Sequence, residues 1–151
     1  MTAFLTAVLI PALVSVVVTI LTTYVYQPIQ GQRQLIGEIA TATRHHSTAT
    51  SKVRADWKTQ GQRDAQKARA EETTQALLML SARLGASPAT FPRRGKYYRL
   101  FEALKLVESR ESVRKASSEL KAWGHWIRMG DSGAAQMHRL EVIKALDLRR
   151  D

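Results

Sequence analysis

The chain contains no cysteine. Disulfide bonds, thiolate chemistry and cysteine-ligated zinc are therefore excluded, and this absence fits a domain in the cytoplasm. Charge is also missing from the N-terminal part, where no Asp, Glu, Lys, Arg or His precedes Arg33. The formal net charge of +10 therefore belongs entirely to the rest of the 151 residues.

Patterns typical of β-strands and of catalytic sites are missing too. No alternation of apolar and polar residues is long enough to predict a strand, and no glycine-rich loop of the phosphate-binding kind occurs. His45 and His46 are adjacent and would point about 100° apart on a helix. His138 and Glu141 share a helical face, but a single pair without a third ligand is typical of a surface hydrogen bond. We therefore expect an all-α protein that is not an enzyme and holds no metal or cofactor.

The uncharged N-terminal run predicts a transmembrane anchor. From Ala3 to Tyr26 the chain has 24 residues, nearly all of them apolar or small. As a helix this run would be about 36 Å long, enough to cross a hydrocarbon core of about 30 Å with some tilt. Tyr24 and Tyr26 lie where an interfacial aromatic belt is expected, and Pro28 marks the exit from the membrane.

A cleaved signal peptide is the alternative to an anchor. The small-x-small triplet Ala40-Thr41-Ala42 has the form of a cleavage site. It lies well beyond the apolar run, however, and the run is longer than the usual h-region of about 7–15 residues and has no basic residue before it. These features favour a retained single-pass anchor.

Basic residues predict the orientation of this anchor. None precedes the apolar run, whereas Arg33, Arg44, Lys52, Arg54 and Lys58 follow it. Because basic residues concentrate on the cytoplasmic side of membrane helices, we expect the N-terminus outside and the C-terminal domain in the cytoplasm.

Small and hydroxyl residues recur along the anchor and predict association with a second copy. They occur at every fourth position and include Ala7, Ser15 and Thr19. Such side chains allow membrane helices to approach closely and to form hydrogen bonds between them. The alternative is that the hydroxyl groups donate to carbonyl groups of their own helix, four residues earlier.

A polar helical stalk or linker is expected to span residues 27–70. Ile39, Ala42, His46, Ala49, Val53 and Trp57 keep a helical spacing. Because most other residues there are alanine or polar, the segment is either a solvated helix or one side of a loose coiled coil. We expect the face with Ile39, Val53 and Trp57 to contact a second copy.

A small helical bundle is expected over residues 71–149. Helical spacing of apolar residues predicts four helices, the first ending at Gly85 and the third beginning at Ser109 or Ser112. The residues expected to face inward are Ala76, Leu77, Leu80, Leu84, Tyr97, Leu100, Phe101, Leu104, Val107, Val113, Ala116, Leu120, Trp123, Ile127, Met137, Leu140, Ile143 and Leu146. A turn over residues 130–133 separates the last two helices.

Basic residues within the bundle predict an anionic partner. From Gly85 onward, Lys and Arg outnumber Asp and Glu by 14 to 8. Arg93, Arg94, Lys96 and Arg99 cluster beside Tyr97. For a tethered chain the nearest anions are lipid headgroups, and nucleic acid is the less favoured partner because no nucleic-acid-binding motif is present. A solvated face with intrahelical ion pairs is the third alternative.

These features favour a non-enzymatic, membrane-tethered interaction or scaffold protein with a basic cytoplasmic domain. Its expected partners are membrane lipid, a second copy of itself and an unknown protein. Two other functions remain open. One is an oligomeric effector that forms pores or lesions, which the Ser and Thr content of the anchor suggests. The other is a tethered nucleic-acid binder.

Overall fold

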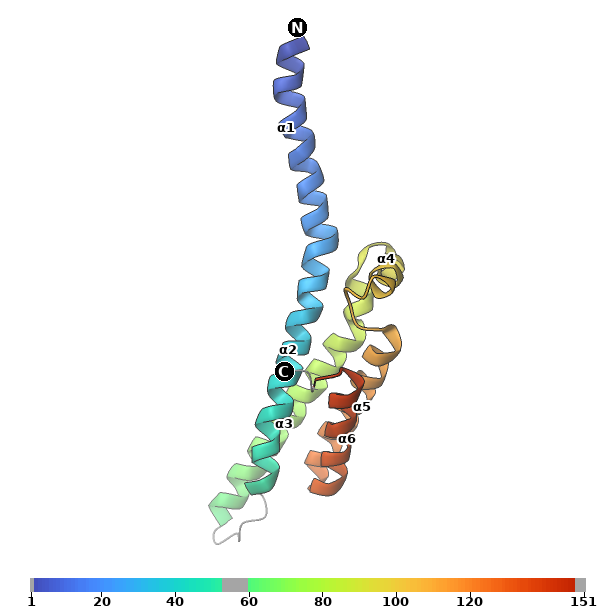
Figure 1. Cartoon of the computed structure of the whole chain (residues 1–151). Helices are drawn as coiled ribbons and strands as arrows, with labels where there is room; N and C mark the ends of the chain where they lie inside the picture. Colours follow the sequence, from blue (N-terminus) through green and yellow to red (C-terminus); the bar gives the residue numbers. More distant parts are fainter. Residues whose placement is uncertain (1, 53–59, 149–151) are drawn as a thin grey trace.

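The protein is all-α, as expected. The computed structural model describes residues 2–52 and 60–148, and these residues form helices joined by short connections (Figure 1). The elements are α1 (Thr2–Leu21), the π-helical turn η1 (Thr22–Tyr26), α2 (Gln27–Lys52), α3 (Gln60–Ala86), the 3₁₀ turn η2 (Ser87–Thr90), α4 (Pro92–Ala103), α5 (Arg110–Met129) and α6 (Ser132–Ala145).

The first three elements make one long rod (Figure 1). Between Leu9 and His45 this rod is long and apolar enough to cross a membrane, and a signal sequence near an N-terminus would have the same length and composition. All the described side chains of α1 are exposed, including Leu13 at 61% and Val17 at 53%. The apolar N-terminal helix is therefore confirmed, and its apolar surface has no cover within the described chain.

The rod continues through Pro28 without a break. A proline inside a helix has no N–H to donate, and its ring presses on the carbonyl group four residues earlier. The wider π-turn at Thr22–Tyr26 ends two residues before this proline. Such a turn rearranges the hydrogen bonds around a helical proline and so lets the helix continue.

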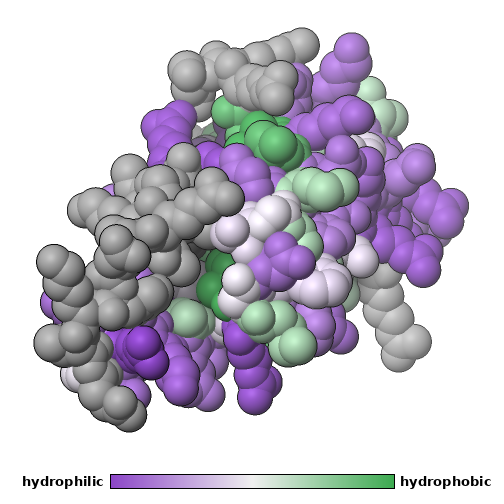
Figure 2. Space-filling model, turned by 90° about the horizontal axis from the view of Figure 1, so that it is seen from below, coloured by the Kyte–Doolittle hydropathy of each residue, from purple (hydrophilic) through white to green (hydrophobic). Residues whose placement is uncertain are grey.

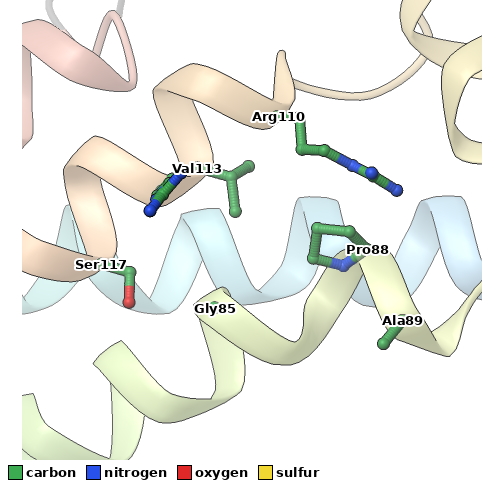
Figure 3. Close-up of a pocket in the computed structure, with 7 residues that line it drawn as sticks. Gly85, Pro88, Ala89, Arg110, Val113 and Ser117 are labelled. Atoms are coloured by element: carbon green, nitrogen blue, oxygen red, sulfur yellow. The ribbon is translucent and has the colours of Figure 1, made fainter.

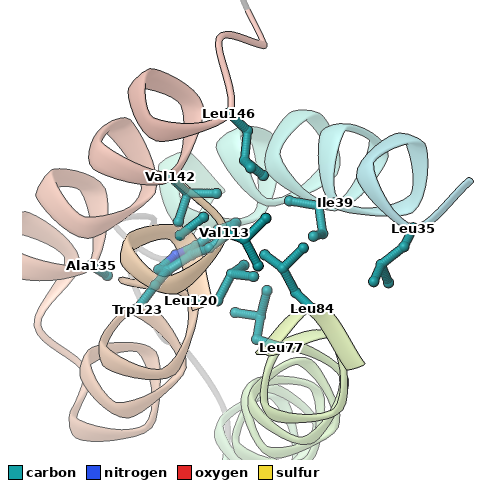
Figure 4. Packing of buried hydrophobic residues seen from close by; sticks show 11 residues of the cluster. Leu35, Ile39, Leu77, Leu84, Val113, Leu120, Trp123, Ala135, Val142 and Leu146 are labelled. Carbon is teal, nitrogen blue, oxygen red and sulfur yellow. The ribbon is translucent and has the colours of Figure 1, made fainter. Parts of the chain in front are cut away.

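The main core lies between α2, α3, α5 and α6 (Figure 4). Taken in this order, the four helices alternate in direction (Figure 1). The stripe expected on α5 is confirmed, because Val113, Ala116, Leu120 and Trp123 are buried. Among the residues that the structure describes, the buried members of this cluster are Leu35, Ile39, Leu77, Leu84, Val113, Ala116, Leu120, Trp123, Ala135, Val142 and Leu146.

Close contact between α3 and α5 depends on small and hydroxyl residues. Thr74 Oγ1 donates a hydrogen bond to the carbonyl oxygen of Gly124 at 3.0 Å, and Ser81 Oγ donates to that of Ser117 at 2.8 Å. A Cβ atom on Gly85 would lie 3.0 Å from Ser117 Oγ. The sequence predicts that α3 ends at Gly85, but the helix continues to Ala86. Because Gly85 has no side chain, it leaves room for α5.

The helix ends around α5 follow the expected capping rules. Ser109 is the N-cap of α5, and its hydroxyl accepts a hydrogen bond from the N–H of Ser112 at 3.0 Å. Gly130 ends α5 in the left-handed conformation that glycine adopts without steric cost. Asp131 then caps α6 by accepting from the N–H of Ala134.

The inward face of α6 differs in part from the expected one, although Leu146 at its end is buried as expected. Met137 is 69% exposed and Leu140 is 41% exposed, whereas Ala135 and Val142 are buried. The sequence analysis assigned the large apolar side chains of this helix to the core because of their helical spacing. The small side chain of Ala135 instead allows α6 to lie close to α5, which turns the methionine outward.

The first part of the expected stalk packs against the bundle. Ile39 is fully buried and Leu35 nearly so, both in the main core. Arg139 Nε on α6 donates to the carbonyl oxygen of Thr43 at 2.7 Å, and Arg83 on α3 forms an ion pair with Glu38 at 2.6 Å. The packed seam on α2 is therefore filled by other helices of the same chain. Val53 and Trp57 lie outside the described residues.

Candidate functional site

A second hydrophobic cluster lies where the rod meets α4. Its buried members are Ile29, Phe91, Tyr98 and Phe101, and Val25 packs against them from η1. The Phe91 and Tyr98 rings meet edge to face with centroids 5.0 Å apart. Aromatic pairs in this geometry add to the stabilisation that burial provides. The cluster thus fixes α4 beside the end of the apolar helix.

A buried polar network supports the same junction. Gln32 Nε2 donates to the hydroxyl oxygen of Tyr98 at 2.8 Å and to Ser87 Oγ at 3.3 Å. Gln32 Oε1 accepts from the N–H of Glu108 at 3.1 Å, and the Tyr98 hydroxyl donates to the Glu108 carbonyl group. Burial raises the pKa of Tyr98 above its ordinary value, so the phenol stays protonated and keeps its donor role.

The basic residues predicted as an anionic site lie on and beside this fixed helix. Arg93, Lys96 and Arg99 are exposed, and among the described residues none of the three forms an ion pair. The Arg93 guanidinium lies 5.5 Å from the centre of the Tyr97 ring. Arg94 belongs to α4, but its side chain is outside the described part. The three described cations are therefore available to an external anion.

Two leucines of α4 and its C-cap also face outward. Leu100 is 53% exposed and Leu104 is 58% exposed, contrary to the inward stripe expected for residues 97–107. The inward positions belong to Tyr98 and Phe101. The physical reason is that the aromatic rings fill the space against Ile29, and a helix of 12 residues cannot bury both faces there.

A shallow pocket of about 400 Å³ opens between the end of α3, η2 and the start of α5 (Figure 3). Its lining includes Gly85, Pro88, Val113 and Ser117, with Arg110 along one side (Figure 3). The Arg110 guanidinium donates to the carbonyl oxygen of Gly95 at 3.4 Å and lies 5.7 Å from the centre of the Tyr98 ring. This arginine therefore serves the fold of α4.

The His138 and Glu141 pair does not form. His138 Nδ1 lies 2.6 Å from a carboxylate oxygen of Glu119, while Glu141 accepts from Lys115 Nζ at 2.7 Å. The Lys115 ammonium lowers the pKa of Glu141, and the same contact raises the pKa of Lys115. Both residues of the expected pair thus connect α6 to α5.

The residues proposed for association of the anchor lie along α1. Thr19 Oγ1 donates to the carbonyl oxygen of Ser15 at 2.8 Å, which is the intrahelical alternative considered above. Ala7 also belongs to α1, although its side chain lies outside the described part. The Ser15 and Thr19 side chains remain exposed, so their surface is open to a neighbouring helix.

No protein-family model, curated protein or solved structure matches this chain. Its function is therefore argued from its own residues. Sequence reasoning found the basic cluster but missed Gln32, whose polar side chain gives no sign of burial, and the outward leucines, which share the helical spacing of the inward residues.

Proposed function

We propose that this chain is a non-enzymatic, membrane-tethered interaction protein whose basic helical domain lies at the cytoplasmic face. The observation that carries the proposal is the continuity of the rod. The apolar helix α1 runs through η1 into α2, and α2 contributes Leu35 and Ile39 to the core of the domain. A helix with these connections holds the domain close to the bilayer in a defined position, as a scaffold requires.

The same continuity favours a retained anchor over a cleaved signal peptide. The triplet Ala40-Thr41-Ala42 lies inside α2. Cleavage after Ala42 would remove Leu35 and Ile39 from the main core and Gln32 from the polar network. A mature protein produced in this way would lack part of its own interior.

The topology is tested with reporters fused after Asp151. A reporter that is active only in the cytoplasm should work there, because basic residues occur only after the apolar run. Membrane pellets washed with carbonate should retain the intact chain, and mass spectrometry should find residues 3–26 still attached. Activity of an exported reporter alone would show that the orientation is inverted, and a product starting at Thr43 would show cleavage.

Self-association is proposed to run through the anchor. Ile39, which had been assigned to a contact between copies, is covered by the chain's own helices. The exposed hydroxyl residues Ser15 and Thr19 remain, and hydrogen bonds between membrane helices contribute about 0.6 kcal/mol each on average. Tethering in one bilayer raises the local concentration of copies, so such weak contacts can add.

Leucine at Ser15 and Thr19 should reduce dimer formation, because the larger side chains prevent close approach while the helix stays apolar. Crosslinking in membranes measures the dimer fraction of the wild type and of the Ser15→Leu/Thr19→Leu variant. A Val14→Leu/Val18→Leu variant is the matched control. Equal dimer fractions for wild type and both variants would place any interface elsewhere.

A further inference from the structure

We propose that α4 is a second membrane contact, which docks on the surface of anionic lipid beside the anchor. In this arrangement Leu100 and Leu104 enter the headgroup region, and Arg93, Lys96 and Arg99 meet lipid phosphates. The inference rests on the proposed membrane anchor, and it adds the surface that orients the domain on the bilayer.

The position of α4 supports this contact. Val25 and Ile29, which touch its aromatic residues, lie at the end of the apolar run and before Arg33, the first charged residue. An anchor that spans the bilayer therefore places this junction at the membrane surface. In Figure 1, α4 lies at the end of the bundle nearest to α1 and beside the rod. The polar network from Gln32 to Tyr98 holds it at that level.

The composition of the surface fits lipid. Half-exposed leucines beside exposed cations are the combination that interfacial helices use, with apolar groups among acyl chains and cations at phosphate. The one acidic residue of α4, Glu102, accepts a hydrogen bond from the N–H of Arg110 through Oε1. Among the described residues at the end of the molecule remote from α1, hydrophilic side chains are the most numerous and hydrophobic ones form small separate patches (Figure 2).

Lipid is favoured over a second copy because of charge and proximity. Two copies meeting through α4 would bring Arg93, Lys96 and Arg99 of each chain together, and like charges repel. An anionic leaflet attracts them instead, and the anchor already holds it within reach. Docking would also cover Leu100 and Leu104, which the described chain leaves exposed.

Environment-sensitive fluorophores test the contact in the full-length chain. Because the chain has no cysteine, single labels are introduced at Leu104→Cys, at Val17→Cys in the anchor and at Met137→Cys on the exposed face of α6. The proteins are reconstituted in vesicles of phosphatidylcholine with phosphatidylglycerol. The label at position 104 should shift to the blue and be quenched by lipids brominated near the headgroup. The label at position 137 should remain as in water.

The electrostatic part has its own measurement. The blue shift at position 104 should weaken in vesicles of phosphatidylcholine alone and in the Arg93→Gln/Lys96→Gln/Arg99→Gln background. A Leu100→Cys label gives a second reporter, and circular dichroism checks that each variant keeps its helical content. If the shift is equal in both lipids and in the triple variant, the assignment of these cations to lipid phosphate is overturned.

The outcomes separate the two proposals. A water-like label at positions 100 and 104, together with a lipid-quenched label at Val17→Cys, overturns the docking of α4 and leaves the anchor in place. A water-like label at Val17→Cys overturns the anchor, and the docking proposal falls with it. A shift at position 104 that depends on protein concentration, or on added nucleic acid without vesicles, assigns the surface to those partners and overturns lipid as its occupant.

Discussion

Replacement of Trp123 with alanine is expected to lower the free energy of unfolding by about 3–5 kcal/mol. Trp123 is only 1% exposed and belongs to the main core, where α5 packs against α3 and α6 (Figure 4). Removal of the indole leaves a cavity that the surrounding helices cannot fill, because Gly124 already places α5 close to Thr74. The loss therefore includes both the transfer free energy and the cavity term.

Urea unfolding of residues 27–151, followed by circular dichroism, measures this effect. The fragment omits the apolar helix but keeps α2, whose buried side chains complete the core. Met137→Ala is the control, because that side chain is 69% exposed and should change the stability by less than about 0.5 kcal/mol. A Trp123→Ala variant as stable as this control would contradict the packing of α5 described above.

Helix α5 shows how much the spacing of apolar residues can predict without other information. Its apolar residues follow a 3-4-3-4 pattern on an otherwise polar helix, so only one face is available for burial. The caps at Ser109 and Gly130 act locally and are equally visible in the sequence. The buried face and the ends of α5 can therefore be predicted from the sequence.

The remaining faces depend on neighbours that the sequence does not identify. On α4, Leu100 and Tyr98 are both apolar enough to be buried, and the choice between them is made by Ile29 and Val25 far earlier in the chain. On α6, the small residue Ala135 determines the contact with α5, although it contributes little to a hydrophobic pattern. Periodicity shows that a helix has a face, while the packing partner decides which face is used.

One property of the candidate site could be predicted from the sequence, and another could not. The basic residues Arg93, Lys96 and Arg99 could be predicted because charge density is a local property of the sequence. Their position beside the end of the apolar helix could not be predicted, because it depends on contacts such as the hydrogen bond from Gln32 to Tyr98, which are 66 residues apart. A polar residue on a polar helix carries no local sign that it will be buried.

Replacement of Ile39 with aspartate should strongly destabilise the protein. The substitution is informative because a solvated stalk predicts almost no change in stability, whereas a packed α2 predicts a large loss. Ile39 is fully buried in the main core, close to Leu35 and the helices of the bundle. A carboxylate placed there would lose its hydration without gaining a hydrogen bond or an ion pair in return. We expect the free energy of unfolding to fall by roughly 4 kcal/mol or more, which is exceptional for one substitution.

Gln34→Asp provides the matched control, because it adds the same negative charge to an exposed position of α2. Urea unfolding of residues 27–151 should show a small change for Gln34→Asp and a large loss for Ile39→Asp. The difference isolates burial from charge, since both variants carry the same charge on the same helix. If the two variants unfold at the same urea concentration, α2 does not complete the core, and the rigid connection between the apolar helix and the bundle must be abandoned. A large difference means that α2, which continues directly from the apolar helix, is part of the packed core of the bundle.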